Sequence, residues 1–198
     1  MQSQATMKVV LVVVLCVALA ATGCTAQWIG VALADLPVLT QMALNLATLV
    51  ATMQAGRQVS PAEAAAIQNI SSSAYSGLNS LQALYNQYRA NPDASTLQKI
   101  QDAIAEINQQ LPVELQAAHI SDPTLAARVA AGVNLILTTV QSFATLVPQT
   151  GASTARRPSA EKVAVPKAGD LKQRWNQQVC ALTGDAAIDA ALAQCGLR

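Results

Sequence analysis

The spacing of apolar residues constrains this chain to helices. Between Leu36 and Met53, apolar residues recur at intervals of three and four. The same spacing returns from Ile67 to Tyr88, from Leu97 to Ala118 and from Leu125 to Val147. Such intervals place side chains on one face of an α-helix, whereas a half-buried strand needs strict alternation. The sequence therefore predicts four amphipathic helices.

Two helix starts and several short turns set the arrangement of these helices. Ser60-Pro61-Ala62-Glu63 has the form of a capping box, with proline preset for the first turn. Asp122 followed by Pro123 predicts a second start, and Asn91-Pro92-Asp93 ends the helix that begins after Ser60. Short connections make consecutive helices antiparallel. We therefore predict an all-α fold: an antiparallel up-down bundle of four main helices, then a flexible linker and a small helical hairpin.

Two prolines fall inside the predicted helices. Proline removes a backbone donor and clashes with the preceding turn, so we expect Pro37 and Pro112 to kink or interrupt their helices. Asp35 would then cap the first helix, which would begin in earnest at Leu36. Residues 113–118 would form a short continuation of the third helix.

Charge is distributed unevenly along the bundle. Residues 36–56 and 129–149 carry none, although amide and hydroxyl side chains line one face of each segment. We expect the first and fourth helices to be neighbours or to lie inside the bundle. Two alternatives are that they line a groove for a neutral ligand, or that they face a membrane or a partner. The net charge of +1 gives no argument for nucleic acid as a partner.

An apolar leader precedes the first helix. Lys8 is followed by an unbroken apolar run of 13 residues, Val9 to Ala21. A membrane-spanning helix needs about 20 apolar residues, so the run fits a secretory signal better than an anchor. We interpret residues 1–23 as a signal peptide whose start is Met7.

The end of the leader, Ala21-Thr22-Gly23-Cys24, resembles the lipobox of bacterial lipoproteins. The resemblance implies cleavage before Cys24 and a diacylglyceryl group, with palmitate-type chains, on its thiol. It also implies a cell-envelope location with the membrane as partner. Thr25 in place of Asp favours the outer membrane if the source is Gram-negative. An uncleaved signal anchor and a plain secreted or cytosolic protein are the alternatives.

The remaining cysteines follow from this assignment. Cys16 leaves with the signal and Cys24 is lipidated, so Cys180 and Cys195 are left to pair as a disulfide in an oxidising compartment. That bridge closes a loop of about 15 residues and adds ~3 kcal/mol of stability. In a cytosolic protein both would be free thiols.

The C-terminal quarter of the chain, residues 149–198, divides into two predicted parts. After the bundle of residues 24–148, residues 149–169 form a basic, flexible linker. Residues 170–198 form a disulfide-closed helical hairpin that turns at Thr183-Gly184, with the bridge at the end away from the turn. Asp170 and Asp185 are its expected caps. The hairpin either docks on the bundle or binds something else.

No residues are nominated for catalysis, a metal or a cofactor. The single histidine, His119, lies near Ser121 and Asp122, and we interpret the three as a helix junction. Three acids have ligand-like spacing: Asp102, Glu106 and Glu114. We interpret them as part of a solvent-exposed helix face.

Our functional prediction is a lipid-anchored, non-enzymatic protein of the bacterial cell envelope with a structural or protein-interaction role. The tail hairpin, or a band of small residues within 71–80, would meet an envelope protein partner. One alternative is a carrier of a small neutral or apolar ligand in the bundle interior. The other is a membrane-inserting helical protein that exposes its charge-free helices.

Overall fold

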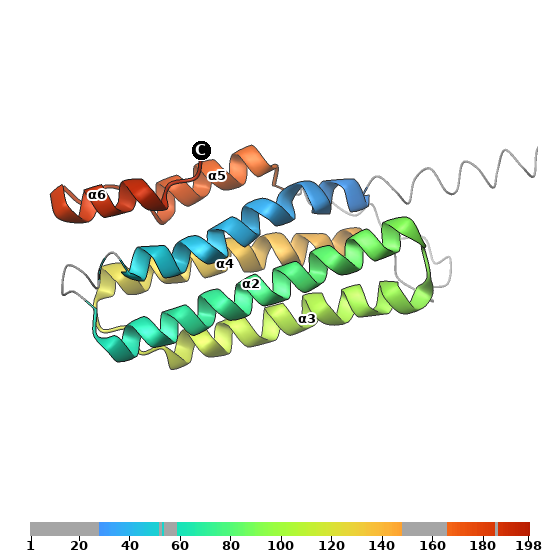
Figure 1. The fold of residues 1–198 in the computed structure, drawn as a ribbon, viewed down its shortest axis with the longest axis horizontal. Helices are drawn as coiled ribbons and strands as arrows, with labels where there is room; N and C mark the ends of the chain where they lie inside the picture. Colours follow the sequence, from blue (N-terminus) through green and yellow to red (C-terminus); the bar gives the residue numbers. More distant parts are fainter. Residues whose placement is uncertain (1–27, 52, 54–58, 148–165, 185) are drawn as a thin grey trace, which may run out of the picture.

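The structure, a computed structural model, describes residues 28–51, 53, 59–147, 166–184 and 186–198. Four long helices pack against one another and two short helices follow them (Figure 1). The helices are α1 (Trp28–Ala51), α2 (Pro61–Ala90), α3 (Ala94–Ala117), α4 (Pro123–Leu146), α5 (Ala168–Gln178) and α6 (Ala186–Cys195). The predicted four-helix all-α bundle is confirmed. The predicted signal peptide, Cys24 and nearly all of the predicted linker lie outside the described residues.

Both predicted helix starts are present. The Ser60 hydroxyl accepts the N–H of Glu63, and the Glu63 carboxylate accepts the N–H of Ser60 at 2.9 Å. Asp122 accepts the N–H of Leu125 at 2.7 Å. Asp93 caps α3 in the same way. These side chains satisfy backbone donors that have no partner inside the first turn of a helix.

Neither proline interrupts its helix, and the kinks expected there stay predictions. Helix α1 runs through Pro37, and α3 runs through Pro112 to Ala117 as one element. The turns before each proline are anchored in the core, because Leu36 and Leu111 are both buried. Burial of these turns offsets the missing backbone hydrogen bond. As a consequence, Asp35 lies inside α1 and does not cap its start.

The predicted apolar stripes form the core. All eight stripe residues of α1 are buried: Leu36, Leu39, Met42, Ala43, Leu46, Leu49, Val50 and Met53. The buried face of α2 is wider than predicted, since Leu78 and Tyr85 are also fully buried. In α4, Leu137 is half-buried and Ala144 is exposed, although both continue the apolar spacing of residues 125–147, while Leu135 is buried. The buried face of α4 is rotated toward the C-terminal helices that cover it.

Glycines allow two close helix contacts. A Cβ at Gly77 would lie 2.8 Å from the Ile107 side chain, so the small-residue band of α2 packs against α3 at this glycine. A Cβ at Gly132 would lie 3.0 Å from Leu46, which confirms that the first and fourth helices are neighbours. Helices α1 and α4 are also long and apolar enough to cross a membrane. Half of each is buried in the bundle, and core helices of soluble proteins meet the same criteria.

Candidate functional site

Helix α5 lies along α1 and runs in the same direction (Figure 1). It is a polar helix that buries two large apolar side chains, Leu171 and Trp175. The Trp175 ring occupies a notch at Gly132 of α4, where a Cβ would come within 3.0 Å of the indole. The absence of a side chain at position 132 therefore makes room for the tryptophan. No feature of the sequence had marked this glycine.

Two charged side chains of the bundle bind the ends of α5. Its N-cap residue, Lys167, provides no side-chain hydrogen bond, and Asp35 of α1 instead accepts the N–H of Ala168. At the other end, Arg128 of α4 donates to the carbonyl oxygens of Val179 and Ala181 at 2.5 and 2.7 Å. An acid at a helix N-terminus and a base at its C-terminus both match the helix dipole.

Both charges are buried. Asp35 is only 2% exposed and its Oδ2 has no hydrogen-bond partner. Burial raises the pKa of Asp35 to about 6, against a smaller lowering by the Ala168 N–H. Burial also lowers the pKa of Arg128, and the carboxylate of Asp189 opposes that shift. The Arg128 guanidinium stays protonated because arginine starts from so high a pKa.

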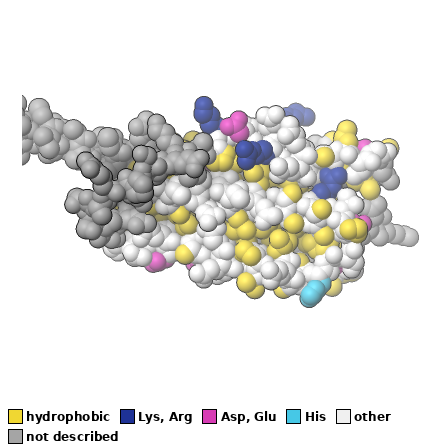
Figure 2. All heavy atoms as spheres, turned by 180° about the vertical axis from the view of Figure 1, so that it is seen from behind, with side chains coloured by type: hydrophobic (Ala, Val, Ile, Leu, Met, Phe, Trp, Pro, Cys, Tyr) yellow, Lys and Arg dark blue, Asp and Glu magenta, His cyan; other side chains and the backbone are white. Residues whose placement is uncertain are grey.

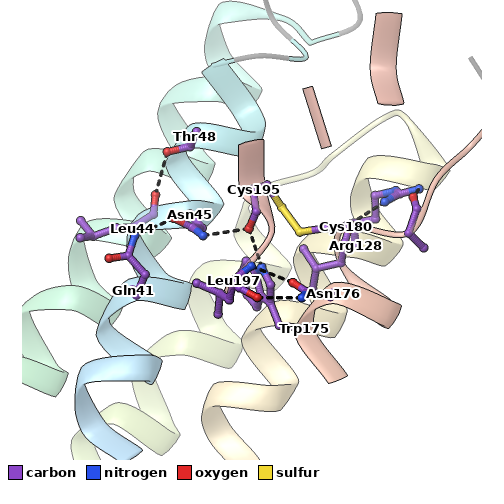
Figure 3. The surroundings of a disulfide bond; sticks show 12 residues. Gln41, Leu44, Asn45, Thr48, Arg128, Trp175, Asn176, Cys180, Cys195 and Leu197 are labelled. Carbon is purple, nitrogen blue, oxygen red and sulfur yellow. Dashed lines mark hydrogen bonds between the residues drawn. A yellow bond between two sulfur atoms is a disulfide. The ribbon is translucent and has the colours of Figure 1, made fainter. Parts of the chain in front are cut away.

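A disulfide joins the C-terminal ends of α5 and α6 (Figure 3). Cys180 and Cys195 form the bond, with their Cα atoms 6.1 Å apart. The carbonyl oxygen of Cys195 accepts two hydrogen bonds, from the Trp175 indole at 2.9 Å and from the Asn45 amide of α1 at 2.8 Å. The predicted cysteine pair is thus present, and the disulfide lies against the bundle.

The hairpin differs from the prediction in its geometry. Helix α5 ends at Gln178, so Cys180 lies in the connection between the two helices. One cysteine of the bridge is therefore beside the turn, whereas the prediction placed the bridge at the end of the hairpin away from the turn. Cys180 lies only three residues before Thr183 in the sequence, and Arg128 binds the carbonyls of Val179 and Ala181 on either side of it. Asp170 lies in the first turn of α5 and is not its cap, and Asp185 lies outside the described residues.

The turn between α5 and α6 is organised by Asp189. Its carboxylate accepts the N–H groups of Thr183 and Gly184 at 2.6 and 3.0 Å, and the Thr183 bond is the largest cause of a lowered Asp189 pKa. Gly184 has φ of 87°, a left-handed conformation that favours glycine. The turn predicted at Thr183-Gly184 is therefore observed.

The last residues run back along α5. The Asn176 side chain donates to the carbonyl of Leu197 and accepts its N–H, both at 2.8 Å. Lys172 Nζ donates to the carbonyl oxygen of Arg198 at 2.6 Å. Of the two possibilities left open for the hairpin, the structure shows docking on the bundle.

A second candidate surface is a groove of about 870 Å³ between α3 and α4. Its lining carries no charge and consists of Gln98, Gln101, Ile104, Ala105, Asn108, Asn134, Leu137, Thr138, Gln141 and Ala144. Figure 2 views the molecule from behind: Lys and Arg lie mostly in the upper part of this face, and white and yellow side chains fill its middle. The polar stripe predicted on the fourth helix thus lines a groove with α3. Asn45, from the corresponding stripe of α1, is buried under the C-terminal residues.

The residues with superficial catalytic or metal-binding spacing have structural contacts. Asp102 and Glu106 are exposed and accept hydrogen bonds from glutamines on their own helix, and Glu114 accepts one from Ser73. Among the described residues, no three His, Cys, Asp or Glu side chains gather closely enough to hold a metal.

The helix junction has contacts of the same kind. His119 is exposed with φ of 43°, Ser121 donates its N–H to Glu63, and Asp122 caps α4. The bonds from the Ser60 hydroxyl, from the Ser121 N–H and from the Ser60 N–H lower the pKa of Glu63 to about 2.

No protein-family model, curated protein or solved structure matches this chain.

Proposed function

We propose that this chain is a lipid-anchored, non-catalytic protein of the bacterial cell envelope that acts through contact with another envelope protein. The groove between α3 and α4 is its contact surface. The observation that carries the proposal is the lining of that groove by uncharged hydrogen-bonding side chains from two helices. The lipobox-like sequence ending at Cys24 supports the location.

The chemistry of the groove specifies the kind of segment that fits it. Asn and Gln side chains each offer a donor and an acceptor, and Ile104 and Leu137 add apolar surface between them. A charged segment would lose hydration there without gaining an opposite charge. The groove therefore favours an uncharged protein segment with polar and small apolar side chains.

Site-specific photo-crosslinking in intact cells tests the proposal. A photoreactive residue at Gln141, inside the groove, is expected to give one discrete crosslinked protein in the envelope fraction. The same residue at Ser72, which is exposed on α2 outside the groove, is the matched control. A second probe variant carries the photoreactive residue at Asn134, also inside the groove. Adding Gln141→Lys to this variant should remove its crosslinked product, because the lysine places a charge in the groove. Equal products from both faces, or none from the groove, would count against this function.

A further inference from the structure

The surface beneath α5 has the features of a receptor for a helix. Asp35 is the only charged residue of α1 and Arg128 is the only one of α4. They bind opposite ends of α5, each with the sign that a helix end prefers. Between them, the notch at Gly132 receives an aromatic ring. This surface therefore specifies the direction of a bound helix, its length and the position of one aromatic side chain on it.

We infer that the α1–α4 seam is a binding groove for a helix of a partner protein, occupied in the closed form by the chain's own α5–α6 pair, and that the Cys180–Cys195 disulfide keeps it closed. A partner helix that fits this groove has free N–H groups at its N-terminus, which donate to Asp35. It carries an aromatic residue seven positions after its first residue, as Trp175 follows Ala168, and it presents its last carbonyls to Arg128.

The disulfide controls closure because it links the contacts of the two short helices. Cys180 follows Val179, whose carbonyl Arg128 binds, and the Cys195 carbonyl binds Asn45 and Trp175. With the bridge intact, α5 and α6 dock as one unit. Without it, the closed loop spanning a separation of 15 residues is lost. We expect docking of the pair to weaken by about a hundredfold.

Opening is a thiol–disulfide exchange with a dithiol reductant. A thiolate of the reductant attacks Cys180 Sγ, the S–S bond breaks, and the Cys195 thiolate takes up a proton. The second thiol of the reductant then displaces Cys180. Two electrons and two protons have passed to the cysteines, and the reductant has become a disulfide.

The test uses the full chain and a fluorescent, disulfide-closed peptide of residues 166–198. The peptide supplies the helix in trans. The receiving proteins are the oxidised wild type and the Cys180→Ser/Cys195→Ser variant, whose own pair cannot lock. We expect fluorescence anisotropy to show binding to the variant at least tenfold tighter than to the wild type. Adding Gly132→Leu to the variant should abolish binding, because leucine fills the tryptophan notch.

A second measurement separates release from misfolding. In a Trp28→Phe background Trp175 is the only tryptophan, so its emission reports whether the ring is buried. Reduction should shift the emission to longer wavelength while circular dichroism keeps the helical signal of the bundle. Equal peptide binding to both proteins, or a reduced protein with unchanged emission, would overturn the inference. Neither result bears on the α3–α4 groove, since the peptide does not enter it.

Discussion

Asp35 and Arg128, the only charged residues of α1 and α4, bind opposite ends of α5. The two helices that are otherwise free of charge thus use their single charges to orient one short polar helix. This relationship explains why the C-terminal pair lies on the bundle in one direction. It also identifies the residues whose change should affect that docking most.

Replacing Arg128 should detach the end of α5. Arg128→Met keeps much of the length of the side chain but leaves the carbonyls of Val179 and Ala181 without their charged donor. We expect a loss of about 2–3 kcal/mol in the free energy of unfolding. Urea denaturation measures it, with Arg89→Met on the surface of α2 as control. A loss no larger than that of the control would show that the arginine does not hold the helix.

Asp35 should make stability depend on pH in the direction opposite to most carboxylates. Its folded pKa of about 6 lies above the ordinary value of 3.8. The stabilising contribution of the protonated Asp35 carboxyl to folding is therefore complete below pH 3.8 and is lost as the pH rises through about 6. We expect wild-type stability to fall across this window by up to ~3 kcal/mol relative to Asp35→Asn, which cannot ionise.

Denaturation of both proteins across that pH window checks this expectation. Asp102→Asn, a change at an exposed site, serves as the control for the loss of one negative charge. Parallel curves for wild type and Asp35→Asn would show that the buried carboxyl does not titrate in this range.

Two helical glycines should respond to alanine with opposite signs. A Cβ added at Gly30 of α1 would have no atom within 4 Å, so Gly30→Ala should stabilise by about 0.5–1 kcal/mol through helix propensity. At Gly77 the added Cβ would lie 2.8 Å from Ile107 and force α2 and α3 apart. Gly77→Ala should therefore destabilise by about 1–3 kcal/mol. Thermal unfolding measures both, and changes of equal sign would contradict the close contact at Gly77.

The cap of α2 should contribute as much as a typical helix cap. Ser60→Ala removes the acceptor for the Glu63 N–H and one donor to its carboxylate. We expect a loss of about 1 kcal/mol. Ser72→Ala, on the exposed face of the same helix, is the control in a urea titration. Equal effects of the two changes would mean that the capping box adds nothing.

The sequence predicted the helices better than the contacts between distant segments. Apolar spacing and the caps at Ser60 and Asp122 are local signals, and they indicated the four long helices and most of their buried faces. Neither proline interrupts its helix, because burial of Leu36 and Leu111 is a tertiary effect that outweighs a local preference. The disulfide partners followed from counting the cysteines that would remain after the predicted loss of the signal peptide and lipidation of Cys24.

The docking contacts had no local signal. Asp35, two residues before Pro37, resembled a cap for its own helix, while its actual contact, Ala168, lies far along the chain. Arg128 was one basic residue near a helix start, and Gly132 was one small residue among many. A search for the single charge in each otherwise uncharged helix would have selected Asp35 and Arg128.

The most direct test of the predicted export, lipidation and disulfide is the intact mass of the protein purified from the cells that produce it. We predict a chain that begins at Cys24, carries added acyl mass and lacks two hydrogens because Cys180 and Cys195 are joined. A chain that still contains residues 1–23, has no acyl mass and keeps both thiols reduced would contradict the envelope location and the locked C-terminal pair together.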